Sequence, residues 1–490
     1  MKKSTLIFLA LGISFILFPL FSDSLGVGQD KNIFGAAQIL SVEIGIVFIL
    51  IGVGLQTIPP LTPPVLGRLG GGVEVLGKVL ETPILFLLIA TFLLLYILFF
   101  ISPLFLTEIH IQYFQKYIPN AWTPYIGFDV EMTVSHINAW LSEGVSPYAD
   151  GIVPYTPFAL ALFTPFIILG YPAYYSVLTL ITVFSYVVSV FWLPLYFLRK
   201  KEYGILALLG VVGLFSYGFQ FELERGQFNV IAFFFILLAI YIFHYQYKYR
   251  YFAYLFFIIA VQLKLYPIIF IVMLVRDWRD IKNNLKRFLA LIALNFSLLF
   301  VLGYQLFSNF MEQIFKRANM QSSRYEDLSI SGFGYFLSEE TQIIATKYAG
   351  LIEKIFLFLF LGVIFAIIYH LYKKNQKGFN PYLFLLSTIG ALIIPAASFD
   401  YKLTILVVPM MLFLYNLPRP TSTKSKMIYT LFIITLSLAY WSTLYPYEFN
   451  QVKPIYLSRN STALLTIFFS STFLYFFLQG KFDNIKNSQE

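Results

Sequence analysis

The sequence predicts an all-α polytopic membrane protein with about 12 to 14 membrane helices. Hydrophobic residues make up 59% of the 490 residues, only 12% are charged, and the mean hydropathy is +0.76 over the whole length. The apolar runs are continuous, as in ILFLLIATFLLLYILFF over 84–100. Backbone groups in lipid are satisfied only by helices or a closed barrel, and barrel strands alternate apolar and polar residues. Continuous runs therefore predict helices.

Apolar runs long enough to cross a bilayer recur along the chain. We expect membrane helices near 5–22, 36–56, 84–106, 174–198, 203–219, 228–245, 288–305, 351–372, 380–395, 403–416, 427–443 and 462–479. The run at 155–170 is predicted to lie along the outer interface, because a crossing there would put the next basic run outside. Lys264 and Pro267 interrupt 251–275. We expect two half-length helices there, which meet near the outer face with Lys264 at the vertex.

The basic residues predict the orientation of these helices. Most of the 34 Lys and Arg lie in short connections at 2–3, 68–78, 199–201, 248–250, 276–287, 373–377, 419–426 and 481–486. The positive-inside rule places these connections, and both termini, in the cytoplasm. The N-terminal run lacks a clear signal-peptide cleavage site, so we expect it to remain as a helix. The sequence thus predicts a multi-pass cell-membrane protein whose longer loops are extracytoplasmic.

The residue inventory excludes several kinds of site. The absence of cysteine excludes disulfides, thiolate catalysis and thiolate-bound metals. The four histidines, at 110, 136, 244 and 370, do not have metal-ligand spacing, and no DxD motif occurs in the outer loops. We therefore expect no metal and no cofactor. We also expect no nucleic-acid partner, since the net charge of +9 lies in loops beside lipid.

Ionisable residues of the first large outer loop are candidates for acid–base chemistry. Asp129 begins a helical pattern, where an aspartate can either cap the helix or act as a base. Glu131 points to another side of that helix, and we expect it to be solvated. His136 lies two turns after Asp129 on the same face. It is either an auxiliary proton carrier or a satisfied interfacial histidine.

Three further outer segments offer polar groups. FELERGQFN (221–229) presents Arg225, Gln227 and Asn229 at a helix entrance, which suits phosphate or sugar hydroxyls, or a plain polar turn. Lys264 within its apolar hairpin needs a partner, and a phosphate or Asp400 could provide one. AASFDYK (396–402) contributes Asp400 and Lys402.

The order of these motifs resembles a known family. The outer-loop aspartate is followed by W…L…G…SPY, PYTPF, RGQFN, KLYPIIF…RDWR and SFDYKL…VVP. This pattern is similar to the membrane glycosyltransferases of the GT-C fold, and among them to the polyprenyl-phosphate-mannose-dependent mannosyltransferases of glycosyltransferase family 87. The resemblance covers roughly 84–416 and implies a GT-C-like core, with 107–173 as a catalytic outer loop that carries juxtamembrane helices. Residues 1–83 would add two N-terminal membrane helices, and 417–490 the C-terminal helices and a cytoplasmic tail.

The resemblance implies that Asp129 is the catalytic base and that Gln227, Asn229 and Lys264 line the donor pocket. The chain would be a hexosyltransferase that moves a sugar, mannose in the first instance, from a polyprenyl-phosphate donor to an extracytoplasmic glycolipid or glycan. Glucose or another hexose, and the pentose arabinofuranose, stay open as the transferred sugar. A lipid-linked donor fits an outer site, where nucleotide sugars are absent. Arg225 and Lys264 would stabilise the leaving phosphate, and Asp400 and Lys402 complete the candidate binding set.

Two other function classes remain open at this stage. A transporter or flippase of lipid-linked sugars should carry ionisable residues near the midplane and repeated halves. Glu43 is such a residue, but no matching second half is apparent. An O-antigen-type polymerase or ligase would use basic residues of a late outer loop, which Lys316, Arg317 and Arg324 could provide.

Overall fold

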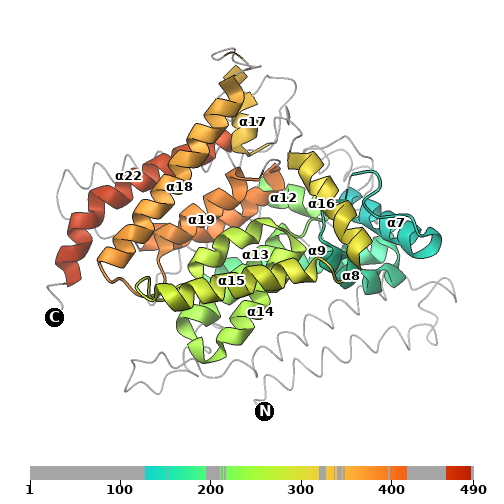
Figure 1. The fold of residues 1–490 in the computed structure, drawn as a ribbon, viewed down its shortest axis with the longest axis horizontal. Coiled ribbons are helices and arrows are strands. Elements are labelled where there is room, and N and C mark those ends of the chain that lie inside the picture. The colour runs from blue at the N-terminus through green and yellow to red at the C-terminus, as the bar shows by residue number, and fades with distance from the viewer. Residues whose placement is uncertain are drawn as a thin grey trace. The chain divides into compact units, whose positions relative to one another are not determined.

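The computed structural model describes residues 127–151, 153–194, 210, 213, 217–318, 327–335, 337–338, 345, 348–395, 398–416 and 460–486. All regular elements in these residues are helices, which confirms the all-α class for them (Figure 1). Internal contacts divide the chain into two compact units, residues 1–94 with 172–180 and residues 95–171 with 181–490. The helices predicted at 5–22, 36–56, 84–106 and 427–443 lie outside the described residues.

The predicted outer loop contains helices, as expected. They are α7 (Phe128–Glu143), α8 (Pro157–Phe163) and the 3-10 helix η4 (Thr164–Leu169). Pro157 and the Thr156 hydroxyl, which accepts a hydrogen bond from Ala159 N, begin α8. After Gly170 come α9 (Tyr171–Val187) and the π-helix η5 (Val188–Trp192). Of the first unit, only 172–180, a part of α9, lies in the described residues.

The middle of the chain forms five helical elements. They are α12 (Tyr217–Arg225), α13 (Asn229–Tyr245), the short 3-10 helix η6 (Tyr247–Tyr249), α14 (Arg250–Leu263) and the 3-10 helix η7 (Tyr266–Met273). Lys264, between α14 and η7, has an extended backbone, so the predicted break of 251–275 at this lysine is confirmed. The segment 221–225 was predicted as a connection but continues α12, because the positive φ of Gly226 ends that helix only after Arg225.

The later helices include one correction. They are α15 (Ile281–Leu298), α16 (Tyr304–Ala318), α17 (Ile330–Tyr335), α18 (Ala349–Lys373), α19 (Pro381–Ile393), η10 (Asp400–Leu406), α20 (Val407–Tyr415) and α22 (Asn460–Lys486). The prediction of a single helix near 288–305 was wrong. The helix starts earlier and ends at Leu298, and Gly303, with a φ of 94°, precedes the separate amphipathic α16.

The core of the second unit is built around α13, which packs against α14, while α12 packs against η10 and α19 against η7. Phe233 of α13 stacks on Phe384 of α19, and Phe270 of η7 packs beside both rings. By contrast, α18 is apolar but little buried, since the side chains of Phe358 and Phe365 are 77% and 70% exposed. Within the described residues, Ala173–Trp192 and Ala349–Lys373 are long and apolar enough to cross a membrane.

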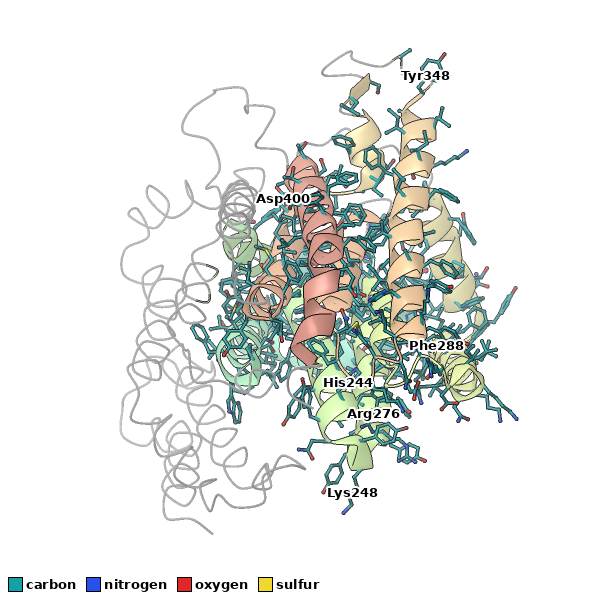
Figure 2. The ribbon with its side chains drawn as sticks, turned by 90° about the vertical axis from the view of Figure 1, so that its left-hand side faces the viewer. His244, Lys248, Arg276, Phe288, Tyr348 and Asp400 are labelled. Atoms are coloured by element: carbon teal, nitrogen blue, oxygen red, sulfur yellow. The ribbon has the colours of Figure 1, made fainter. Side chains whose placement is uncertain are left out.

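Three basic connections of the second unit meet one another. Arg279 donates hydrogen bonds to the carbonyls of Tyr372 and Lys373, and Lys377 pairs with Asp277 at 2.8 Å. Arg276 lies over the ring of Tyr247, at 4.5 Å from its centroid. Figure 2 shows Lys248 and Arg276 in the lower part of this unit and Asp400 in its upper part. The structure therefore separates the connections predicted as cytoplasmic from a segment predicted to be outside.

Candidate active site

Asp129 lies in the first turn of α7, where Gly127 enters the helix with a φ of 82°. The Gly127 N–H donates to the carbonyl of Glu224 at 2.6 Å, which ties the start of α7 to α12. The carboxylate makes no side-chain cap of α7, so the interpretation of Asp129 as a capping residue is wrong. The side chain of Asp129 is instead turned toward groups from the α12–α13 connection and is 17% exposed.

Gln227 connects Asp129 with Lys264. Its amide nitrogen donates to Asp129 Oδ2, and its amide oxygen accepts from Lys264 Nζ at 2.6 Å. An amide has an acceptor at one end and donors at the other, so the lysine fixes which end faces the carboxylate. Residues 98 and 37 positions apart in sequence thereby form one polar chain, and Gln227 itself is 3% exposed.

Arg225 supplies a second positive group beside Asp129. Its Nη1 lies 3.6 Å from Asp129 Oδ1, and its Nε lies 3.7 Å from the Glu224 carboxylate. The guanidinium also lies over the rings of Phe128 and Phe221. These contacts hold the cation at the end of α12, next to the carboxylate, although it is still 16% exposed. A negatively charged ligand could therefore reach it.

Lys264 is held by its surroundings on two sides. Its ammonium group lies 4.5 Å from the centroid of the Tyr155 ring, in a cation–π arrangement, and donates to Gln227. Thr156, the next residue, donates from its hydroxyl to the carbonyl of Gln262 just before Lys264. The partner of Lys264 in the structure is thus Gln227, and not Asp400 as one alternative suggested.

Glu222 is a buried acid that the sequence argument did not single out. Its carboxylate accepts from Asn229 Nδ2 at 2.8 Å and from the Val230 N–H at 3.0 Å. It therefore satisfies donors at the start of α13, as a capping carboxylate does. Asn229 is fully buried and is used for this contact, so it supports the connection between α12 and α13. Its place in the polar segment FELERGQFN, just before an apolar helix, was the available signal.

Asp400 and Lys402 lie on η10 and are buried. Lys402 donates to the Ser398 hydroxyl at 3.2 Å, and its ammonium group lies 5.8 Å from the centroid of the Tyr266 ring. The same segment pairs with Asp327, whose carboxylate accepts from the backbone N–H groups of Ser329 and Ser398. Asp327, also missed from the sequence, thus ties the segment before α17 to the segment before η10.

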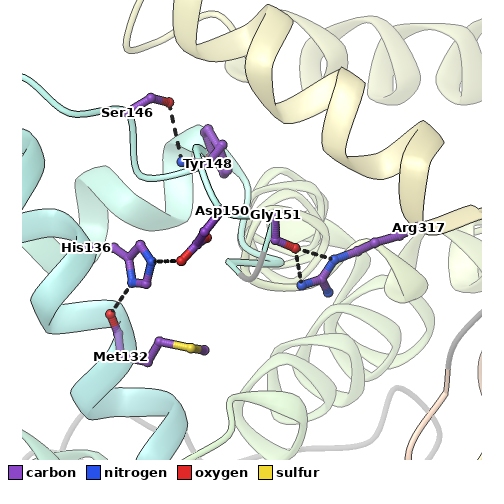
Figure 3. A network of polar contacts seen from close by, with 7 residues as sticks. All are labelled: Met132, His136, Ser146, Tyr148, Asp150, Gly151 and Arg317. Atoms are coloured by element: carbon purple, nitrogen blue, oxygen red, sulfur yellow. Dashed lines mark hydrogen bonds and ion pairs between the residues drawn. The ribbon is translucent and has the colours of Figure 1, made fainter. Parts of the chain in front are cut away.

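Glu131 and His136 are not brought to Asp129. His136 bonds through Nδ1 to the Met132 carbonyl at 2.6 Å and through Nε2 to Asp150 (Figure 3). Both ring nitrogens of His136 therefore have nearby hydrogen-bond partners, on the side of α7 that faces the loop after that helix. Glu131 is half-buried, and its carboxylate makes no polar contact within the part of the chain that the structure describes.

The surroundings of Asp129 shift its proton affinity. Burial raises the pKa of the Asp129 carboxyl above its ordinary value, and this effect outweighs the lowering by Arg225, by the Gln227 hydrogen bond and by Lys264. A carboxylate with a raised pKa is a stronger base than an exposed aspartate. The cations and the amide keep it oriented. A basic carboxylate flanked by positive groups can accept a proton beside a site that attracts an anion.

The site therefore places a part-buried carboxylate beside cationic side chains, and a comparison with protein families shows to which family the chain belongs. A sequence model described as glycosyltransferase family 87 matches residues 154–398, half of the chain. The chain belongs to this family of membrane glycosyltransferases. The matched range contains Arg225, Gln227, Asn229 and Lys264, whereas Asp129 precedes it. No curated protein and no solved structure matches the chain.

Proposed function

We propose that the chain transfers a sugar, mannose in the first instance, from a polyprenyl-phosphate donor to an extracytoplasmic glycolipid or glycan acceptor. Asp129 is the general base, and Arg225 and Lys264 bind the donor phosphate. The observation that carries this proposal is the chain of contacts Lys264–Gln227–Asp129, because it puts a basic carboxylate next to two cations. The family match supports the glycosyl transfer. The cations beside Asp129 suit a phosphate-bearing donor, and the polyprenyl chain and mannose rest on the resemblance described for the sequence.

The reaction uses these groups in one displacement. An acceptor hydroxyl oxygen attacks the anomeric carbon from the side opposite the phosphate, and the bond from that carbon to the phosphate oxygen breaks. The hydroxyl proton goes to Asp129, a contribution of roughly 10²–10⁴-fold to the rate. The polyprenyl phosphate leaves with an additional negative charge, which Arg225 and Lys264 stabilise.

A membrane location and an outer active site are supported by two features of the second unit. α18 exposes large apolar side chains along its length, which suits contact with lipid. The connections around Arg276, Arg279 and Lys377 join one another. Figure 2 shows Arg276 well apart from Asp400. If this basic end is cytoplasmic, the end that carries Asp400 is extracytoplasmic. We propose a multi-pass cell-membrane protein with both termini in the cytoplasm.

Transfer of radiolabel from polyprenyl-phosphate [¹⁴C]mannose by the purified full-length protein tests the function. With a membrane extract as acceptor source, we expect label to appear in a product that no longer partitions with the donor. A transporter or flippase would leave the donor chemically intact while moving it across vesicles. An intact donor after long incubation with wild-type protein, for every polyprenyl-phosphate hexose offered, would contradict the proposal.

The absence of cysteine allows a direct test of sidedness. Glu143 and Lys374 are both exposed. Glu143 belongs to the loop predicted to be outside, and Lys374 belongs to a basic connection predicted to be cytoplasmic. Each is replaced by cysteine in a separate variant. In intact cells or spheroplasts, we expect a membrane-impermeant maleimide to label only the first variant. Labelling of Lys374→Cys alone would show that the orientation is inverted and would contradict an outer active site.

A further inference from the structure

The helix α16 packs along the loop that follows α7. Asn309 donates to the Ser146 hydroxyl at 2.9 Å, and the ring of Phe310 lies 5.6 Å from that of Tyr148. Two turns further on, Arg317 donates through Nε and Nη2 to the Gly151 carbonyl at 3.3 and 3.0 Å (Figure 3). The three contacts follow one another along the helix, so one face of α16 covers this loop.

Gln313 lies on that covering face, between Phe310 and Arg317, because residues three and four apart share one side of a helix. Its side chain is 4% exposed, yet neither its amide oxygen nor its amide nitrogen has a hydrogen-bond partner within the described residues. A buried amide with both ends unpaired costs free energy in a folded protein. Such a side chain is a candidate for contact with a ligand.

The position of Arg317 links this face of α16 to the candidate active site. Arg317 lies within electrostatic range of the Asp129 and Asp150 carboxylates and near the Tyr155 and Tyr401 rings. Asp129 in turn experiences the field of Arg317 in addition to those of Arg225 and Lys264. Tyr155 is also the ring that contacts the Lys264 ammonium group. The end of α16 therefore lies close enough to interact electrostatically with the proposed base and its surroundings.

We propose that Gln313, with Arg317 beside it, forms a subsite for the hydroxyl groups of a sugar ring. The amide offers an acceptor and two donors, and vicinal hydroxyls can satisfy both ends at once. A phosphate, which only accepts, would leave the amide oxygen unpaired. This inference rests on the proposed function, and the ring belongs either to the transferred sugar or to the acceptor. Gln313 thereby contributes to the recognition of the sugar, while Asp129 carries the proton.

Binding of a neutral sugar probe can be measured without turnover. We suggest saturation-transfer NMR of methyl α-mannopyranoside with the full-length protein in nanodiscs, comparing wild type, Gln313→Met and Gln305→Met. Gln305 lies exposed on the same helix and provides a matched control. We expect about tenfold weaker binding for Gln313→Met, as for the loss of one or two hydrogen bonds, and wild-type binding for Gln305→Met. Inorganic phosphate should retain its affinity in both variants.

Thermal unfolding separates recognition from support of the fold. Removing an unpaired buried amide should leave the melting temperature of Gln313→Met at or above that of wild type. If this variant does not fold, Gln313→Asn keeps the amide but withdraws it by one methylene group, and the same weakening is expected. Unchanged sugar binding in a folded variant, as when a trapped water satisfies the amide, overturns the subsite.

Transfer kinetics identify the source of the ring. With polyprenyl-phosphate mannose as donor and octyl α-mannoside as acceptor, a raised KM for the acceptor alone assigns the subsite to the acceptor. A raised KM for the donor alone assigns it to the transferred sugar. Wild-type transfer together with unchanged binding and KM values in Gln313→Met refutes the subsite but leaves the proposed function. If wild type shows no transfer but Gln313→Met weakens sugar binding, the proposed function is refuted and the subsite is kept.

Discussion

Asp129 and Asp150 are two carboxylates near the same helix with opposite surroundings. Asp129 is 17% exposed and lies among Gln227, Arg225 and, one contact further, Lys264. Asp150 is 39% exposed and pairs with His136. Burial raises the pKa of Asp129. The comparison teaches that burial against Gln227 and Arg225, which the exposed Asp150 lacks, distinguishes the carboxylate that can act as a base.

The largest expected effect comes from exchanging each carboxylate for its amide. Asp129→Asn should lower kcat by roughly 10²–10⁴-fold, because the general base is lost while the shape of the side chain is kept. The matched variant Asp150→Asn should retain activity. Steady-state transfer assays on both purified variants make the test. Equal losses in the two would remove the distinction between the two carboxylates.

Next in size is the loss of the lysine that orients Gln227. Lys264→Met should weaken donor binding by roughly 10–10²-fold, as expected for a charge-assisted contact with phosphate. The same exchange at Lys282, which is exposed near the basic connections, is the control. Binding of a labelled polyprenyl-phosphate sugar measures both. Unaltered donor affinity in Lys264→Met would mean that this lysine only supports the fold.

A smaller effect is expected in the pH dependence. The base acts when ionised, so kcat/KM should fall as the pH drops through the raised pKa of Asp129, at a higher pH than for an ordinary aspartate. Gln227→Met removes a hydrogen bond that lowers this pKa, so the acid limb should move to still higher pH. Profiles from about pH 4 to about pH 8 suffice. A shift to lower pH in the variant would contradict the assignment.

The smallest effect concerns His136, two turns after Asp129 on α7. His136→Gln should change kcat by less than about threefold, because an exposed histidine–aspartate pair contributes little. An activity loss comparable with that of Asp129→Asn would instead make His136 an auxiliary proton carrier. The same transfer assay decides between the two roles.

Much of the fold was predictable because apolar runs, and the charges and prolines that interrupt them, are local signals. The boundaries of α13, α18 and α19 follow from continuous hydrophobicity, and the break at Lys264 follows from a charge and a proline in an apolar run. The start of α16 was missed, since an amphipathic helix directly after an apolar one leaves no clear gap in hydropathy.

The candidate site was predictable in its residues but not in its pairings. Asp129, Gln227 and Lys264 stand out individually as polar groups in apolar surroundings. Their connection spans 98 and 37 positions and depends on how the segments pack, which no local pattern contains. Gln313 gave no signal at all, because an amide on an amphipathic helix attracts notice only when its burial is known.

The central claim is that Asp129 accepts the proton of an acceptor hydroxyl beside a phosphate held by Arg225 and Lys264. A cryo-EM structure of Asp129→Asn with polyprenyl-phosphate mannose and an acceptor glycoside bound tests it most directly. We expect the acceptor hydroxyl within about 3 Å of the residue-129 side chain and the phosphate next to both cations. A donor bound elsewhere, with residue 129 out of reach of any hydroxyl, would contradict the account.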